Sequence, residues 1–275
     1  MYYVILGLIQ GLTEFLPISS SGHLVLGKYL LKLEMPGVAF ETFLHFVTTL
    51  AVLFLFKKDI AEIIISFIKS LKYILHPKIF INFIKTDYQS KFAYLLIIST
   101  VPGAFFGYFL QDFFKQIFSS PIITALMLLI TGLCLFFTDT GTRQGNKQLK
   151  DITIADAILI GLAQALAIVP GLSRSGFTIM MSLTRKLDRK FAAKYSFILS
   201  VPIILGATLF EMKEISRIDI NLVYLIFAGI ITFLTGYWAM NFFIKMLVNF
   251  KLKYFSFYLW FIGLAVIIYN YNANL

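Results

Sequence analysis

The chain has 275 residues, of which 59% are hydrophobic and 14% are charged, and its mean hydropathy is +0.84. These values exclude an ordinary soluble domain and indicate an integral membrane protein. The single cysteine, Cys134, excludes a disulfide framework and a thiolate metal site. The net charge is +10, but the basic residues are not interleaved with aromatic residues as on a nucleic-acid-binding surface.

The first element along the chain is an apolar segment that stops at a proline and a serine-glycine cluster, GLIQGLTEFLPISSSGH (7–23). The same pattern returns in the second half as GLAQALAIVPGLSRSGF (161–177). Such a tandem repeat of broken apolar helices is how membrane proteins place polar atoms inside the bilayer. We therefore expect the functional site at these two breaks.

Six longer apolar runs follow in chain order, and each is long enough, at about 1.5 Å per residue, to cross a hydrocarbon core of about 30 Å. They lie near 38–57, 91–110, 120–138, 191–211, 222–244 and 255–272. The broken segments are different, because His23 to Leu33 offers only 11 residues after the first break. We therefore predict that each broken segment enters and leaves the membrane on one side as a re-entrant hairpin.

Each half then consists of one re-entrant hairpin and three crossings. Because three is odd, the second half must be inverted relative to the first. The predicted fold is an all-α polytopic membrane protein, with six transmembrane helices and two re-entrant helical hairpins in two inverted-topology repeats. The repeats are 1–140 and 151–275 within a single membrane domain, 1–275.

The distribution of lysine and arginine gives the orientation. The predicted topology puts the loops 57–91, 143–150, 185–194 and 245–253 on one side, with 18 basic residues in all. The other side receives five: Lys28, Lys32, Lys115, Lys213 and Arg217. By the positive-inside rule the rich side is cytoplasmic, so both termini and the mouth of the first hairpin face outside. The segment 59–85 has the lysine spacing of an interfacial amphipathic helix.

Polar side chains at membrane depth are costly and usually pair or act. Gln10 and Glu14 are four residues apart and share one helix face. Glu14 is either a structural partner of Arg174, or a base or metal ligand. Glu41 and His45 share the same spacing on the first full span, and we expect them to pair with neighbours.

The residues of the two breaks admit a structural and a functional interpretation. Ser19, Ser20 and Ser21 could satisfy free backbone groups, but three serines exceed that need. His23 is either an interior histidine or a proton carrier beside the serines. Arg174 has no solvated surface at this depth, so an oxyanion partner is the better interpretation.

The two serine-glycine clusters suggest the ligand. Each precedes a half-helix whose free N–H groups and positive dipole end favour an anion. With the fork of Arg174, this arrangement suits a phosphate or diphosphate whose lipid tail stays in the bilayer. Glu14, His23 and a serine hydroxyl add the groups needed for phosphoryl transfer. The expected substrate-binding residues are Gln10, Ser19, Ser21, Gly22, Ser173, Ser175 and Gly176.

The motifs resemble those of a known family. Gln10-x-x-x-Glu14 followed by FLPISSSGH (15–23), and PGLSRSG (170–176), are similar to the two signatures of the bacterial undecaprenyl-diphosphate phosphatases, the bacitracin-resistance proteins. The resemblance covers essentially the whole chain. It implies hydrolysis of the terminal phosphate of undecaprenyl diphosphate, which regenerates the carrier lipid for cell-wall synthesis.

The resemblance also implies that Glu14, Ser20, His23 and Arg174 are catalytic. It implies a location in the bacterial inner membrane with the site open to the outer face, and a divalent cation such as Mg²⁺ or Ca²⁺, with Glu14 as a ligand. Gln10 stands where many members have glutamate, and Ser21 where many have threonine. Gln10 leaves Glu14 as the sole carboxylate of its pair, which weakens any metal site.

Two mechanisms and one rival function stay open from the sequence. Ser20 attacks the outer phosphorus with its proton drawn off by Glu14 or His23, or water attacks directly while Ser20 positions the substrate. The rival is a lipid-phosphate transporter or flippase, because inverted repeats with broken helices are also a transporter architecture. The expected partners are the lipid diphosphate, the membrane and a second copy of the chain in a homodimer.

The topology is directly testable. Cysteines placed at Gly141 and Ser119 in a Cys134-free background should label from opposite sides of intact cells, with Ser119 accessible from outside. Labelling of both from the same side would contradict the inverted repeat.

Overall fold

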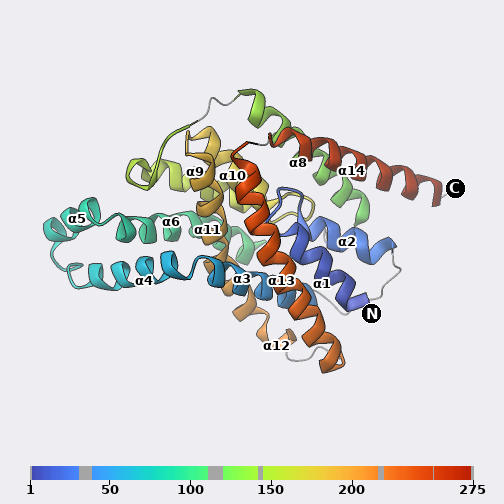
Figure 1. Cartoon of the computed structure of the whole chain (residues 1–275), viewed down its shortest axis with the longest axis horizontal. Helices are drawn as coiled ribbons and strands as arrows, with labels where there is room; N and C mark the ends of the chain where they lie inside the picture. Colours follow the sequence, from blue (N-terminus) through green and yellow to red (C-terminus); the bar gives the residue numbers. More distant parts are fainter. Residues whose placement is uncertain are drawn as a thin grey trace.

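The computed structural model describes residues 2–30, 39–110, 120–141, 145–215, 220–249 and 251–273, and its main elements are α-helices (Figure 1). One short 3₁₀ turn, Leu149–Asp151, and one isolated bridge between Lys147 and Leu187 interrupt them. The α-helices are α1 (Tyr2–Thr13), α2 (Ser20–Leu30), α3 (Ala39–Leu55), α4 (Lys57–Leu71), α5 (Pro77–Thr86), α6 (Tyr88–Phe109), α8 (Pro121–Gly141), α9 (Ile154–Leu166), α10 (Arg174–Thr184), α11 (Arg189–Phe210), α12 (Met212–Ile215), α13 (Leu222–Leu247) and α14 (Lys253–Ala273). The prediction of an all-α polytopic membrane protein is confirmed.

Five helices in the described ranges are long and apolar enough to cross a membrane: α6, α8, α11, α13 and α14. The remaining predicted span, 38–57, corresponds to α3, which has 17 residues and bends by 85° into α4. If the bent pair is taken as one span, the described ranges contain six. Helix α4 begins directly after the bend with Lys57 and Lys58. Two adjacent charges are costly within the hydrocarbon core, which explains why the chain bends before them.

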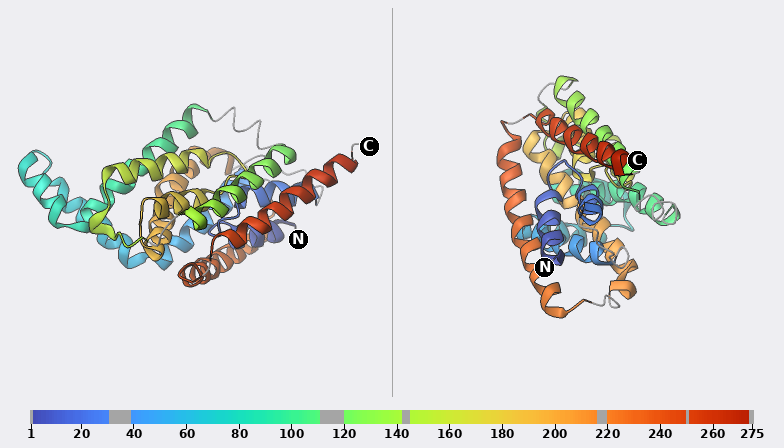
Figure 2. Two further views of the ribbon diagram at one scale, coloured as in Figure 1. Left: turned by 90° about the horizontal axis from the view of Figure 1, so that it is seen from above. Right: turned by 90° about the vertical axis from the view of Figure 1, so that its right-hand side faces the viewer.

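The prediction of one continuous amphipathic helix over 59–85 is wrong, because the helix is interrupted. The segment forms two helices, α4 and α5, because Pro77 begins α5 and cannot continue a helix from the residues before it. Figures 1 and 2 show α4 and α5 at one end of the molecule, and α5 has no buried residue. Exposed isoleucines and lysines share this region, as an interfacial location requires.

The two repeated motifs fold into matching pairs of short helices. The first pair is α1 and α2, with 12 and 11 residues, and the second is α9 and α10, with 13 and 11 residues. Each helix is too short to span the bilayer. The members of each pair pack on one another, as the predicted hairpins require.

The repeats are interlocked. Helix α1 of the first repeat packs on α13 of the second, and α9 of the second packs on α6 of the first. Glycines permit both contacts: a Cβ on Gly7 would lie 2.7 Å from the Ala228 carbonyl oxygen, and one on Gly161 would lie 2.6 Å from that of Ser99. Helices α8 and α14 also pack on each other. The boundaries 1–140 and 151–275 stay a prediction.

The orientation in the membrane also stays a prediction. Of the positions on which it depends, Lys32, Lys115, Ser119, Arg143 and Arg217 lie outside the described residues.

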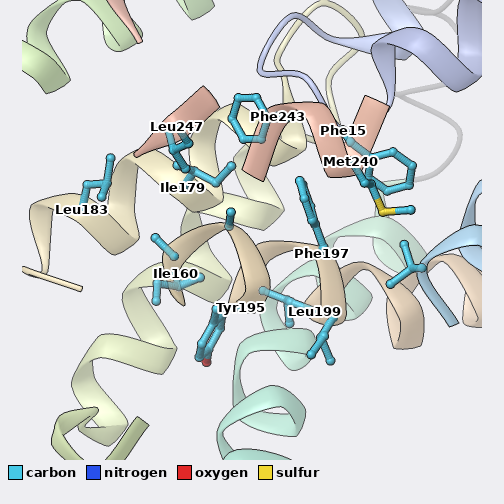
Figure 3. Packing of buried hydrophobic residues seen from close by; sticks show 14 of the residues in the cluster. Phe15, Ile160, Ile179, Leu183, Tyr195, Phe197, Leu199, Met240, Phe243 and Leu247 are labelled. Atoms are coloured by element: carbon cyan, nitrogen blue, oxygen red, sulfur yellow. The ribbon is translucent and has the colours of Figure 1, made fainter. Parts of the chain in front are cut away.

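Phe15 anchors the first break in the hydrophobic core. It lies between α1 and α2, is 1% exposed, and meets the ring of Phe197 on α11 edge-on at 5.2 Å. Figure 3 shows it beside Met240 of α13, with Phe243 on the same helix. Because Phe15 directly follows Glu14, this packing fixes where the carboxylate can lie.

The close helix contact predicts a stability difference between two identical substitutions. Gly161→Ala should cost about 1–3 kcal/mol, because its Cβ would meet the backbone of Ser99. The protein in detergent should therefore unfold several degrees lower. Gly206→Ala is the matched control, since its Cβ would meet nothing within 4 Å. Equal unfolding temperatures for the two variants would contradict this packing.

Candidate active site

The site begins at the end of α1, where Gln10 and Glu14 lie on one face. The Glu14 N–H donates to the Gln10 carbonyl oxygen at 2.9 Å, so the helical turn continues through Glu14. Gln10 Nε2 donates to Glu14 Oε2 at 2.9 Å, and both side chains are buried. The prediction that these residues share a face is confirmed.

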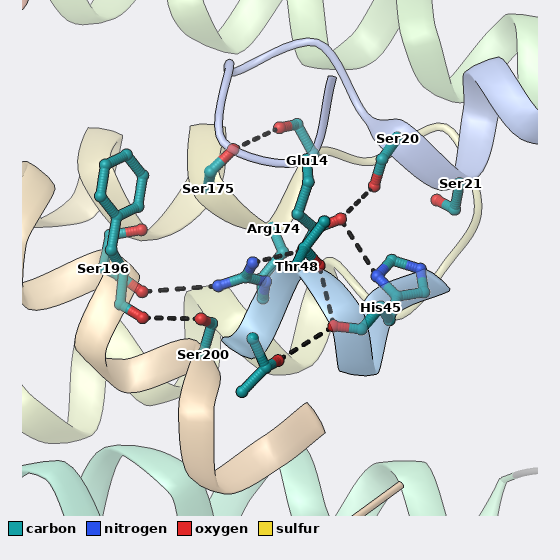
Figure 4. Close-up of polar contacts among 12 residues, drawn as sticks. Glu14, Ser20, Ser21, His45, Thr48, Arg174, Ser175, Ser196 and Ser200 are labelled. Atoms are coloured by element: carbon teal, nitrogen blue, oxygen red, sulfur yellow. Dashed lines mark hydrogen bonds and ion pairs between the residues drawn. The ribbon is translucent and has the colours of Figure 1, made fainter. Parts of the chain in front are cut away.

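Glu14 is the centre of the polar cluster (Figure 4). Its Oε1 accepts from Arg174 Nη2 at 2.6 Å, and its Oε2 accepts from Ser20 Oγ at 2.5 Å. His45 Nδ1 lies 3.1 Å from the same Oε2. The carboxylate of the first repeat thus pairs with the guanidinium of the second, while Ser20 donates its proton toward that carboxylate.

The two serine clusters cap their helices in the same way. Ser19 Oγ accepts from the Gly22 N–H at 3.2 Å, and Ser173 Oγ accepts from the Gly176 N–H at 3.1 Å. Both satisfy a free N–H at the start of a helix. Ser19 adopts a positive φ of 68°, which turns the chain sharply into α2.

The two loops contact one another through reciprocal hydrogen bonds. Ser175 Oγ donates to the Leu16 carbonyl oxygen at 2.9 Å, and Ser19 Oγ donates to that of Leu172 at 3.4 Å. Each loop therefore donates a serine hydroxyl to a backbone acceptor at the break of the other loop. The prediction that the two broken segments meet is confirmed.

A cavity of about 210 Å³ opens between these loops and α3, α6 and α11. Its polar lining comes from Glu14, Ser19, Ser20, Ser21, Glu41, Thr42, His45, Gln164, Ser173 and Arg174. Its apolar lining comes from Gly103, Ala167, Ile168, Leu172, Ile203, Ile204 and Ala207. Such a cavity can hold a polar head group beside an apolar chain.

His23 does not join this cluster. Its Nδ1 lies 2.8 Å from the Ser19 carbonyl oxygen, its Nε2 lies 2.8 Å from the Tyr258 hydroxyl, and its ring stacks on that tyrosine. Ser19 belongs to the first serine cluster, so His23 lies beside the serines as expected. Its catalytic role stays a prediction.

His45 is the histidine that contacts Glu14. Besides Glu14, it contacts Gln10, whose Nε2 is 2.9 Å from Nδ1. Glu41, one turn earlier on α3, forms an ion pair with Lys28. The predicted pairing of Glu41 and His45 with neighbours is confirmed, but the place of His45 in the site was missed. The available signal was its four-residue spacing from Glu41, the same spacing that singled out Gln10 and Glu14.

Comparison with known proteins identifies the family. The family model described as bacitracin resistance protein BacA matches residues 3–265. The chain belongs to this family. Two similar relatives, each named undecaprenyl-diphosphatase, come from Alkaliphilus metalliredigens, with 39% identity over 97% of both chains, and Halothermothrix orenii, with 38% identity over 96% of both chains. A third with that name, from Methanosphaera stadtmanae, is 38% identical over 96% of both chains.

Few side chains of this BacA family member could bind a metal ion at the site. No group of three or more His, Cys, Asp or Glu side chains among the described residues could hold a metal ion. Glu14 accepts from Gln10 Nε2, and Gln10 Oε1 is a buried oxygen without a hydrogen-bond partner in the described part of the chain. These two oxygen donors fit a hard cation that takes its other ligands from phosphate oxygens and water.

Proposed function

We propose that this protein is an undecaprenyl-diphosphatase. It hydrolyses undecaprenyl diphosphate to undecaprenyl phosphate and inorganic phosphate, and so recycles the carrier lipid of peptidoglycan synthesis. The observation that carries the proposal is the contact of Ser20, Glu14 and Arg174 in one cavity inside a membrane protein. Membership of the BacA family and the names of the relatives support it.

The diphosphate binds between the two capped helices. The starts of α2 and α10 supply N–H groups and the positive ends of two helix dipoles, and Ser19, Ser21 and Ser173 line the cavity with hydroxyls. The hydroxyl of Ser175 instead donates to the Leu16 carbonyl oxygen. Arg174 binds the phosphate oxygens through its planar fork. The lipid chain lies along the apolar lining of the cavity, so that it never leaves an apolar environment.

Substrate binding prepares the nucleophile. Arg174 holds Glu14 Oε1 before the substrate arrives, and the phosphate oxygens then compete for the same guanidinium. Once Arg174 binds the phosphate oxygens, the Glu14 carboxylate is a better acceptor for the Ser20 proton, which already points at Oε2. Arg174 meanwhile stabilises the charge that develops on the transferred phosphoryl group.

In the proposed reaction, Ser20 Oγ forms a bond to the terminal phosphorus while the bond to the bridging oxygen breaks. Its proton passes to Glu14, and undecaprenyl phosphate leaves. Water then attacks the phosphoserine, the phosphorus–Ser20 bond breaks, and inorganic phosphate leaves. In the competing version water attacks the diphosphate directly and Ser20 only positions it. His45 holds Glu14 in both versions, and His23 is the alternative proton carrier.

A divalent cation, Mg²⁺ or Ca²⁺, is part of the proposal. Glu14 and Gln10 would hold it together with substrate oxygens. When bound, such an ion neutralises charge on the diphosphate.

The proposed location is the bacterial inner membrane with the cavity open to the outer face. The apolar spanning helices support a multi-pass membrane protein, and the lysine and arginine distribution supports this orientation. A homodimer stays a prediction. The relatives' names favour hydrolysis over the transporter alternative.

The direct test uses purified protein in detergent with undecaprenyl diphosphate. We expect equal amounts of inorganic phosphate and undecaprenyl phosphate, with repeated turnover. Movement of the intact diphosphate across a liposome membrane without phosphate release would support the transporter instead.

Two substitutions test the chemical roles. Arg174→Lys keeps the charge but loses the planar fork, so turnover should fall at least about 100-fold. The matched control is Arg189→Lys, since Arg189 lies outside the cavity and donates to the Leu247 carbonyl oxygen. Ser20→Ala should abolish turnover if Ser20 is the nucleophile. A Ser20→Ala variant that keeps more than roughly a tenth of the activity would favour direct attack by water.

Gln10→Glu distinguishes two roles for Gln10. If Gln10 is a cation ligand, a second carboxylate should tighten the apparent metal affinity, because a hard dication prefers a charged oxygen. If Gln10 only holds Glu14, two adjacent carboxylates raise the pKa of the pair and shift the activity optimum to higher pH. A metal titration and a pH profile of both proteins separate these results. No change in either would place Gln10 outside the reaction centre.

A further inference from the structure

Gln164 is a second buried glutamine in the cavity, and the proposed reaction does not yet use it. It lies on α9, at the position of the second repeat that corresponds to Gln10 in the first. Its side chain is 2% exposed and lines the same cavity as Ser20 and Arg174.

The two glutamines differ in their partners. Gln10 uses its amide nitrogen on Glu14 and His45. In the second repeat Ile168 occupies the position of Glu14, so Gln164 has no carboxylate one turn away. Its Nε2 donates only a long hydrogen bond, of 3.5 Å, to the Ser99 carbonyl oxygen. Its Oε1 has no hydrogen-bond partner among the described residues.

The surrounding helices hold this amide in place. Helix α6 approaches closely, because a Cβ on Gly103 would lie 3.4 Å from Gln164 Nε2. With Nε2 directed at Ser99 on α6, Oε1 is the amide atom left without a partner in a side chain that lines the cavity. A buried acceptor without a donor is costly, so its presence in a binding cavity calls for a ligand that donates.

The two carboxylates of the cavity already accept hydrogen bonds. Glu14 accepts from Arg174 and Ser20, and Glu41 accepts from Lys28. The oxygens of an ionised diphosphate are themselves acceptors, so they bind to Arg174, the hydroxyls and the helix N–H groups rather than to Gln164. The reactant that needs an acceptor is water.

We propose that Gln164 accepts a hydrogen bond from the water molecule that attacks phosphorus. This inference rests on the proposed hydrolase function. The water oxygen forms a bond to the phosphorus of phosphorylated Ser20, and the bond from phosphorus to Ser20 Oγ breaks. Glu14 returns to the serine the proton that it took in the first step, and both protons of the water leave with the phosphate. In direct attack the broken bond is that to the bridging oxygen. Gln164 orients the water and takes no proton.

The test compares Gln164→Met, which has a similar volume but no strong acceptor, with Gln164→Glu, which keeps an oxygen at the same reach. Steady-state kinetics of phosphate release from undecaprenyl diphosphate should show kcat for Gln164→Met reduced at least about tenfold. KM should stay within about threefold, because the diphosphate does not contact Gln164. Gln164→Glu should exceed Gln164→Met in kcat by at least threefold. Leu162→Met on the exposed face of α9 is the matched control and should behave as wild type.

A first-turnover measurement adds a second readout that does not depend on steady-state activity. If Ser20 is phosphorylated, Gln164→Met should release one equivalent of undecaprenyl phosphate rapidly, and inorganic phosphate slowly. The inference is overturned if kcat of Gln164→Met stays within threefold of wild type, if the loss lies only in KM, or if Gln164→Glu is no better than Gln164→Met. Failure of the proposed function is distinct, because wild-type protein would then release no phosphate.

Discussion

Glu14 carries a carboxylate at only 5% exposure, and Arg174, which comes from the other repeat, is the charged group that makes this burial tolerable. Removing one partner of such a pair typically costs about 3–5 kcal/mol, because the other charge is left buried alone. Each charge therefore depends on the other, and this dependence ties the two breaks together. The serine hydrogen bonds from each loop to the other's backbone complete the junction.

The internal repeat explains how one scaffold supplies different chemical groups. Ser20 and Arg174 occupy corresponding positions, as the first residues of α2 and α10, and both contact Glu14. One repeat thus provides the hydroxyl and the other provides the cation at the same place in the fold. Glu14 and Ile168 are a second such pair, with a carboxylate in one repeat and an apolar side chain in the other. The pseudo-symmetric loops therefore enclose an asymmetric site.

The sequence predicted those contacts of the site that lie within one helical turn. The four-residue spacing of Gln10 and Glu14 and the serine-glycine caps follow from helix geometry, and the repeat itself indicated that the breaks meet. The spacing of Glu41 and His45 marked His45 as a polar residue of interest, but its contact with Glu14 depends on how α3 packs against α1, which that spacing does not give. The contact of His23 with Tyr258, which is distant in the chain, was not predicted for the same reason. Pro77 is the opposite case. It is a local signal for a helix start, but the prediction of one helix over 59–85 followed the amphipathic pattern instead.

The central claim is that the two broken segments, one from each repeat, meet at a single site. Pro17→Cys with Gly176→Cys in a Cys134→Ala background tests it, because the Cβ of Pro17 lies 3.4 Å from the position of a Cβ on Gly176. This is close to the separation of about 3.5–4.5 Å that a disulfide requires. After mild oxidation and denaturation, a maleimide gel-shift assay should detect no free thiol, and reduction should restore two. The pair Pro17→Cys with Gly206→Cys should keep both thiols free. Two free thiols in the test pair under the same oxidation would contradict the account.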